Sequence, residues 1–165
     1  MTIPNSRNIN YLVFSGCIFL ILVALYMEHA MALEPCPLCI LQRVAVITTG
    51  VVALIAALFN PGIKGIRIFG SVGVITASLG AALAVRQLWL QNLPKDEVPA
   101  CGPGLDYLMD VFPLTEVLSM ILTGDGSCAE VLWTLFGISI PGWTLIGFIG
   151  LIAISLFQII KPRLS

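Results

Sequence analysis

Long apolar segments separated by polar connections dominate the chain. Four of them, residues 11–27, 40–59, 66–90 and 143–160, approach or exceed the roughly 20 residues that a membrane-spanning helix needs. Small residues recur at helical spacing in the second and third segments, as is typical of helices that pack closely in lipid. We therefore predict an all-α integral membrane protein, a single membrane domain over residues 1–165 built as a bundle of four transmembrane helices.

Composition supports this class. Hydrophobic residues make up 58% of the chain and charged residues only 10%, and the mean hydropathy is +1.01. Soluble domains contain about 25% charged residues, so an ordinary soluble fold is disfavoured. The net charge of −1 leaves no basic surface to neutralise phosphates, which argues against a nucleic-acid partner.

The distribution of charge predicts the orientation. Basic residues before the first segment, between the second and third, and after the fourth mark one side as cytoplasmic. The other side receives two outer loops, 28–39 and 91–142, which hold all nine acidic residues and a single lysine, Lys95. Ala30-Met31-Ala32 imitates a signal-peptide cleavage site, but the preceding run is about spanning length and cleavage would leave three spans. We expect an uncleaved first helix and both termini in the cytoplasm.

Cysteine placement indicates redox chemistry. Four of the five cysteines, Cys36, Cys39, Cys101 and Cys128, lie in the outer loops, whereas Cys17 lies within an apolar segment. An even number of loop cysteines fits disulfides in an oxidising compartment, with Cys17 left as a buried thiol. Zinc would favour a second C-x-x-C pair, but Cys101 and Cys128 are 27 positions apart, so we expect no metal.

Cys36 and Cys39 form a C-x-x-C pair where the second span begins. A disulfide across so small a ring gains little from loop closure, and such pairs are common in redox catalysis. Cys39 is expected near the positive end of the helix, with Arg43 one turn further on, so both would stabilise a thiolate. The alternative for Arg43 is an interfacial arginine that reaches the headgroups, and Arg86, Trp89 and Trp143 are interpreted as interfacial anchors.

The long outer loop is divided by prolines and contains a short amphipathic helix. Apolar residues recur at helical spacing between positions 114 and 122. This helix is interpreted either as lying on the membrane surface or as covering the top of the bundle. Both interpretations are compatible with the same function.

The two cysteines of this loop have different surroundings. Ser127 and Glu130 match a capping box, which would put Cys128 in a first helical turn and make it a good leaving group. Cys101 follows an extended Val-Pro-Ala segment and precedes Gly-Pro-Gly, so it is expected to be accessible to a partner. We hypothesise an exchangeable Cys101–Cys128 disulfide that is attacked at Cys101. A static structural disulfide is the alternative.

Motifs along nearly the whole chain resemble one family. The stretches "EPCPLCILQR", "RQLWLQNLP", "PAC", "GDGSCAE" and "LFGISIPGW" follow one another on the four-span frame. In this set and order the chain resembles the bacterial disulfide bond formation protein B (DsbB) family. A DsbA–DsbB–quinone route is known to keep the bacterial periplasm oxidising.

The resemblance implies an enzyme of the inner membrane, a protein-dithiol:quinone oxidoreductase. A reduced DsbA-like periplasmic oxidase would attack Cys101 of the Cys101–Cys128 disulfide, and Cys128 would then pass electrons to Cys36. This would free Cys39 from the Cys36–Cys39 disulfide to attack a membrane quinone, with Arg43 stabilising the charge. The quinol would return the electrons to the respiratory chain. The resemblance leaves open ubiquinone or menaquinone, and a general or a dedicated partner.

One position departs from the family. Some members carry a histidine near the outer end of the third span, where we align Gln87. A neutral amide donates a hydrogen bond to a quinone oxygen but supplies no proton, so we expect Gln87 as a quinone contact and no histidine proton donor. The alternative to an enzyme is a non-catalytic membrane protein that two outer disulfides stabilise.

Overall fold

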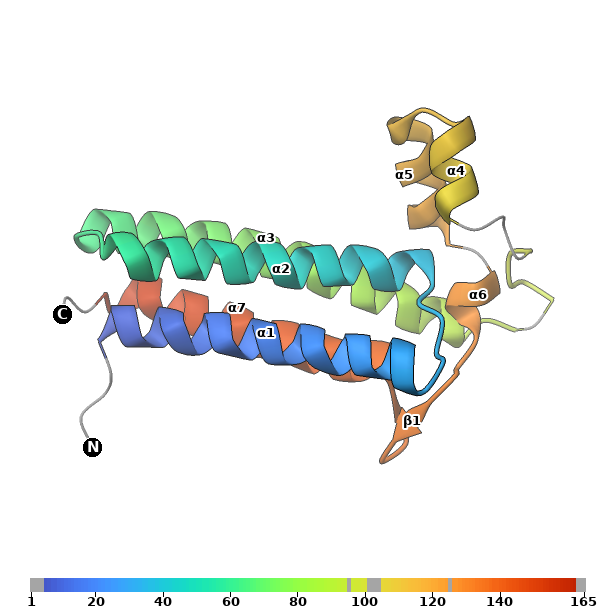
Figure 1. Cartoon of the computed structure of the whole chain (residues 1–165), viewed down its shortest axis with the longest axis horizontal. Coiled ribbons are helices and arrows are strands. Elements are labelled where there is room, and N and C mark those ends of the chain that lie inside the picture. Colours follow the sequence, from blue (N-terminus) through green and yellow to red (C-terminus); the bar gives the residue numbers. More distant parts are fainter. Residues whose placement is uncertain (1–4, 95, 101–104, 125, 163–165) are drawn as a thin grey trace.

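The protein is described by a computed structural model covering residues 5–94, 96–100, 105–124 and 126–162. Within these residues, the helices long and apolar enough to cross a membrane are α1 (Ser6–Ala30), α2 (Pro37–Phe59), α3 (Ile63–Gln91) and α7 (Ile140–Ile160). They run lengthwise beside one another, and α1 begins at the end of the bundle where α7 finishes (Figure 1). The predicted all-α, four-span fold is confirmed.

Each long helix begins before or ends after the apolar segment that predicted it, and in α1 and α2 a side chain caps the first turn. The Asn5 side chain accepts the backbone N–H of Asn8 at 2.9 Å, so α1 begins at Ser6. The α2 helix ends at Phe59, and its C-cap residue Asn60 takes a left-handed conformation (φ 41°) and donates its N–H to the carbonyl of Ala56 at 3.1 Å. Capping adds polar turns that hydropathy alone assigns to loops.

The helices pack in the order α1, α2, α3, α7, with small residues where backbones approach. Ala77 of α3 is fully buried, and Gly80 lies under the Phe148 ring of α7, where a Cβ would be 2.2 Å from the ring. Gly50 of α2 similarly faces Cys17 of α1, a buried thiol, as the sequence predicted. Close approach of this kind supplies the van der Waals contacts that hold helices together in lipid.

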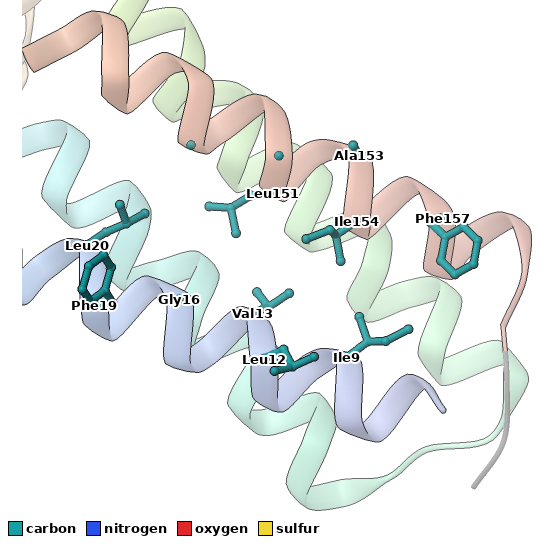
Figure 2. Close-up of a pocket in the computed structure, with 12 residues that line it drawn as sticks. Ile9, Leu12, Val13, Gly16, Phe19, Leu20, Leu151, Ala153, Ile154 and Phe157 are labelled. Atoms are coloured by element: carbon teal, nitrogen blue, oxygen red, sulfur yellow. The ribbon is translucent and has the colours of Figure 1, made fainter. Parts of the chain in front are cut away.

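An apolar groove of about 620 Å³ separates α1 from α7 (Figure 2). Its lining comes from residues 9–20 of α1 and 147–157 of α7. These stretches belong to the half of the bundle nearest the start of α1 and the end of α7. The groove therefore lies away from the end of the bundle that carries Cys36, Cys39 and Cys128, which is called the cysteine-bearing end below.

The connection between α3 and α7 is a series of short elements at the cysteine-bearing end (Figure 1). It contains α4 (Leu105–Val111), α5 (Leu114–Thr123), α6 (Gly126–Ala129) and an antiparallel hairpin of β1 (Thr134–Leu135) and β2 (Ile138–Ser139). In the view of Figure 1, α4 and α5 lie to one side of the bundle and the hairpin to the other. The long outer loop is thus folded against the ends of the spans.

The amphipathic helix α5 packs on the end of the bundle, as one of the two interpretations of its sequence expected, and its contact with the membrane surface stays a prediction. Val117 and Ile121 are buried against the cysteine-bearing end of the bundle, whereas Leu114, Leu118 and Leu122 are exposed. Arg86 of α3 donates to the last carbonyls of α5, Leu122 O at 3.3 Å and Thr123 O at 2.9 Å. Arg86 was expected to anchor in headgroups, but in the structure it fixes α5 to α3.

Candidate redox site

The C-x-x-C pair begins α2. Cys36 is the N-cap residue, and its Sγ accepts the backbone N–H of Cys39 at 3.4 Å, while Pro37 at the first turn has no N–H to satisfy. The two sulfurs lie 3.0 Å apart, well beyond the roughly 2.05 Å of a disulfide bond. Both cysteines are free thiols in this structure. The Cys36–Cys39 disulfide of the oxidised form stays a prediction.

Gln87 of α3 lies directly against this pair. Its Nε2 donates to Cys39 Sγ at 3.2 Å and to Cys36 Sγ at 3.3 Å. Its Oε1 accepts Nε2 of Gln42 at 2.7 Å, which fixes the orientation of the amide. Both glutamines are buried. Gln87, expected to contact a quinone, is thus placed as a hydrogen-bond donor to both sulfurs.

Arg43 reaches towards α1. Its guanidinium forms an ion pair with Glu28 and also donates to the carbonyl of Ala24 at 3.3 Å. Both charged side chains are partly exposed, at 23% for Arg43 and 30% for Glu28. The position of Arg43 is therefore set by an interhelical carboxylate as well as by its spacing from Cys39.

Cys128 lies beside Cys36, and its side chain is fully buried. Hydrogen bonding with Cys128, then with Cys39, and burial together raise the pKa of the Cys36 thiol well above its usual value of 9.0. The two sulfurs share an apolar cluster with residues of α2, α3, α4 and α5: Leu38, Leu90, Leu108, Val117 and Ile121. Cys36 thus has a sulfur neighbour on each side, Cys39 within its own helix turn and Cys128 from the long loop.

The predicted capping box at Ser127 is wrong. The α6 helix begins at Gly126 and ends at Ala129, so Ser127 lies inside it and Glu130 lies beyond it. The Gly126 N–H donates to the carbonyl of Ala100 at 3.4 Å, so the first residue of α6 makes a tertiary contact. A single helical turn has little macrodipole, so α6 offers little of the dipole effect that the capping box implied.

Cys101 lies outside the described residues, and so does the predicted Cys101–Cys128 disulfide. The contact between Ala100 and Gly126 nevertheless joins the two branches of the long loop just before α6. Within the described part of the chain, no group of three or more His, Cys, Asp or Glu residues would hold a metal ion. The structure does describe three neighbouring thiols, Cys128 beside Cys36 and Cys36 beside Cys39, and this arrangement is suited to thiol–disulfide exchange.

Sequence reasoning missed two residues of this site, Gln42 and Glu28. Gln42 is a buried amide in an otherwise apolar span, where polar groups are costly and usually have a role. Glu28 is the only acidic residue of α1 and lies near its outer end. Each carried a detectable signal, a polar group within a predicted span or at its edge.

Comparison with known proteins agrees with this site. The family model described as "Disulfide bond formation protein DsbB" matches residues 6–158. Proteins named "Disulfide bond formation protein B" from Hahella chejuensis and Saccharophagus degradans are 52% and 48% identical, over 96% and 94% of both chains respectively. "Disulfide bond formation protein B 1" of Pseudomonas aeruginosa is 41% identical over 98% of this chain and 99% of its own. The chain therefore belongs to the DsbB family.

Proposed function

We propose that the protein is a protein-dithiol:quinone oxidoreductase of the bacterial inner membrane. It would reoxidise a soluble DsbA-like thiol oxidase in the periplasm and pass the electrons to a membrane quinone. The observation that carries this proposal is the row of thiols Cys128, Cys36 and Cys39 at the end of a membrane-spanning helix. Such a row links a loop that faces water with a sulfur at the edge of the lipid.

The first exchange takes place in the long loop. A thiolate of the reduced partner attacks Cys101 of a Cys101–Cys128 disulfide, forming a mixed disulfide and releasing Cys128 as a thiolate. The second thiol of the partner then displaces Cys101, so that the partner leaves as a disulfide and Cys101 as a thiolate. Burial of Cys128 supports this direction of attack, because a fully buried sulfur is inaccessible to a soluble partner.

The second exchange uses the contact between Cys128 and Cys36. Cys128 attacks Cys36 of a Cys36–Cys39 disulfide, so that a Cys36–Cys128 bond forms, the Cys36–Cys39 bond breaks and Cys39 leaves as a thiolate. Because Cys128 contacts Cys36, Cys39 is the sulfur that leaves, and the Gln87 amide, which donates to both sulfurs, is within 3.2 Å of it. The raised pKa of Cys36 disfavours Cys36 as the ionised member of the pair.

The residues around Cys39 fit a quinone as the final acceptor. Cys39 is partly exposed at the start of a spanning helix, so a lipid-soluble molecule has access to it. A quinone is a lipid-soluble carrier that takes up two electrons and two protons and leaves as a quinol. Arg43 and Gln87 would hold it as hydrogen-bond donors. Glu28 would keep the Arg43 guanidinium oriented towards α1.

A quinone-reduction assay tests the proposal. The full-length protein in lipid nanodiscs is mixed anaerobically with a reduced DsbA-type oxidase and a soluble quinone, and quinol is measured by absorbance. We expect one quinol per partner dithiol, and loss of turnover in Ser variants of Cys36, Cys39, Cys101 or Cys128. Cys17→Ser is the matched control and should retain activity, since this buried thiol lies away from the site. Failure to form quinol, or turnover that survives Cys39→Ser, would contradict the proposal.

A further inference from the structure

The turn of the β1–β2 hairpin departs from ordinary turn chemistry. Phe136 and Gly137 form its tip with positive φ angles of 53° and 77°. Two-residue turns of this kind favour Asn-Gly or Asp-Gly, because a large side chain is strained in the left-handed conformation. Such strain persists where the residue serves another purpose.

Phe136 is also the most exposed large hydrophobic residue in the described part of the chain, at 88%. Its neighbours are similar in kind, since Val131, Leu132 and Leu135 are all more than two-fifths exposed. No charged residue occurs from Val131 to Trp143. Among the described residues, the hairpin therefore presents an uncharged apolar tip that is exposed.

The position of the hairpin identifies what covers this tip. Strand β2 ends at Ser139 and the spanning helix α7 begins at Ile140, so the hairpin is continuous with a membrane-crossing segment. Figure 1 shows β1 at the level of the last turns of α1 along the bundle axis, projecting sideways from the helices. A sideways projection at the end of a spanning helix points into the interfacial layer of the bilayer.

The hairpin is also held firmly at its base. The Gln91 side chain of α3 donates to the carbonyl of Glu130 at 3.4 Å and accepts the Ser139 hydroxyl at 2.8 Å, so it joins both ends of the segment. The Trp143 indole N–H donates to the carbonyl of Leu135 at 3.2 Å. These bonds fix the direction in which the tip points, and Trp143 is of the residue type enriched at membrane interfaces.

We propose that the hairpin is a membrane anchor that inserts Phe136 and Leu135 into the lipid interface at the cysteine-bearing end of the bundle. The bilayer is favoured over a soluble protein partner because the tip has no charge and continues directly into α7. The anchor follows Cys128 by only a few residues, so it would hold the α6 segment at the membrane surface. The proposal is independent of the quinone chemistry.

Photocrosslinking tests the insertion. Phe136 is replaced by the photoreactive analogue p-benzoylphenylalanine in the full chain, in nanodiscs of phosphatidylethanolamine and phosphatidylglycerol. Exposed Leu12 on α1 is the lipid-facing control, and exposed Glu97 in the polar connection is the aqueous control. Because burial favours a phenylalanine side chain in lipid by about tenfold or more, lipid adducts at position 136 should match those at Leu12 and exceed those at Glu97 by about that factor. Adducts at the Glu97 level, or adducts mainly to an added DsbA-type oxidase, would overturn the proposal.

A pair of substitutions separates anchoring from folding. Phe136→Asn relieves the backbone strain and removes the apolar tip, whereas Phe136→Leu keeps an apolar tip. With the photoreactive analogue placed at Leu135, lipid adducts should fall several-fold in the Asn variant and persist in the Leu variant. The thermal midpoint in detergent should not decrease in the Asn variant. A lower midpoint would show that Phe136 packs within the protein and would refute the anchor.

Discussion

Replacing Gln87 with leucine removes the amide that lies against both sulfurs of the C-x-x-C pair. A hydrogen bond to a charged group contributes about 1.5–3 kcal/mol, and each 1.4 kcal/mol is about a factor of ten. Loss of the 3.2 Å bond from Gln87 to Cys39 should therefore reduce the thiolate population of Cys39 at neutral pH by about 10- to 150-fold. The rate of iodoacetamide alkylation of Cys39 in the dithiol form, followed by peptide mass spectrometry, should fall by that factor.

The same substitution also affects folding, so a second variant is needed. Gln87→Leu leaves Nε2 of Gln42 buried without its 2.7 Å acceptor, which should cost about 1–3 kcal/mol of stability. The double variant Gln42→Leu/Gln87→Leu removes both partners and should recover most of this stability, while Cys39 alkylation stays slow. An unchanged alkylation rate in Gln87→Leu, or a rate restored in the double variant, would refute the role assigned to the amide.

Three further predictions concern the Arg43–Glu28 ion pair, the packing of α3 on α7 and the Cys36 thiol. Glu28→Ala removes the interhelical partner of Arg43 and should raise the KM for quinone several-fold, with less effect on kcat. Glu34→Ala is the control, and a KM in Glu28→Ala equal to that of the control would contradict this prediction. Gly80→Ala places a Cβ 2.2 Å from the Phe148 ring and should lower the thermal midpoint, at a cost of about 1–3 kcal/mol, whereas Gly16→Ala, with nothing within 4 Å, should not. The raised pKa keeps the Cys36 thiol protonated in the folded protein, whereas the same thiol in the unfolded chain loses its proton near pH 9. The unfolded state is therefore favoured at high pH, and the dithiol form should lose stability as pH rises above about 9. The oxidised form should lack this decline, and parallel pH profiles for the two forms would argue against it.

The spans were predictable because lipid imposes a simple demand on the sequence. A helix that crosses a bilayer must be apolar over about 20 residues, and it satisfies its backbone hydrogen bonds within its own segment. The small residues were predictable for a related reason, since Gly73 and Ala77 recur at helical spacing, Gly73 faces Ser155 of α7 and Ala77 is fully buried. The boundaries were less accurate, because capping by Asn5 and Cys36 depends on side-chain hydrogen bonds and not on hydropathy.

The contacts within the site were harder to predict, because they join residues that are far apart in the chain. Gln42 and Gln87 are separated by 45 positions, and neither has a periodic signature that points to the other. The spacing of Arg43 from Cys39 was visible in the sequence, but its ion pair with Glu28 depends on how α1 packs against α2. Ser127 shows the opposite error, since its local motif was present but α6 begins one residue earlier, at Gly126, whose N–H bonds to Ala100.

Trapping the intermediate between the two dithiols tests the central claim most directly. Fully oxidised protein, freed of quinone and kept anaerobic, is mixed with one equivalent of reduced DsbA-type oxidase, quenched with an alkylating agent and mapped by peptide mass spectrometry. The account predicts a Cys36–Cys128 disulfide together with an alkylated Cys39, because Cys128 lies beside Cys36 and Cys39 is the leaving sulfur. An intact Cys36–Cys39 disulfide after the partner has been oxidised, or a mixed disulfide that contains Cys39, would contradict it.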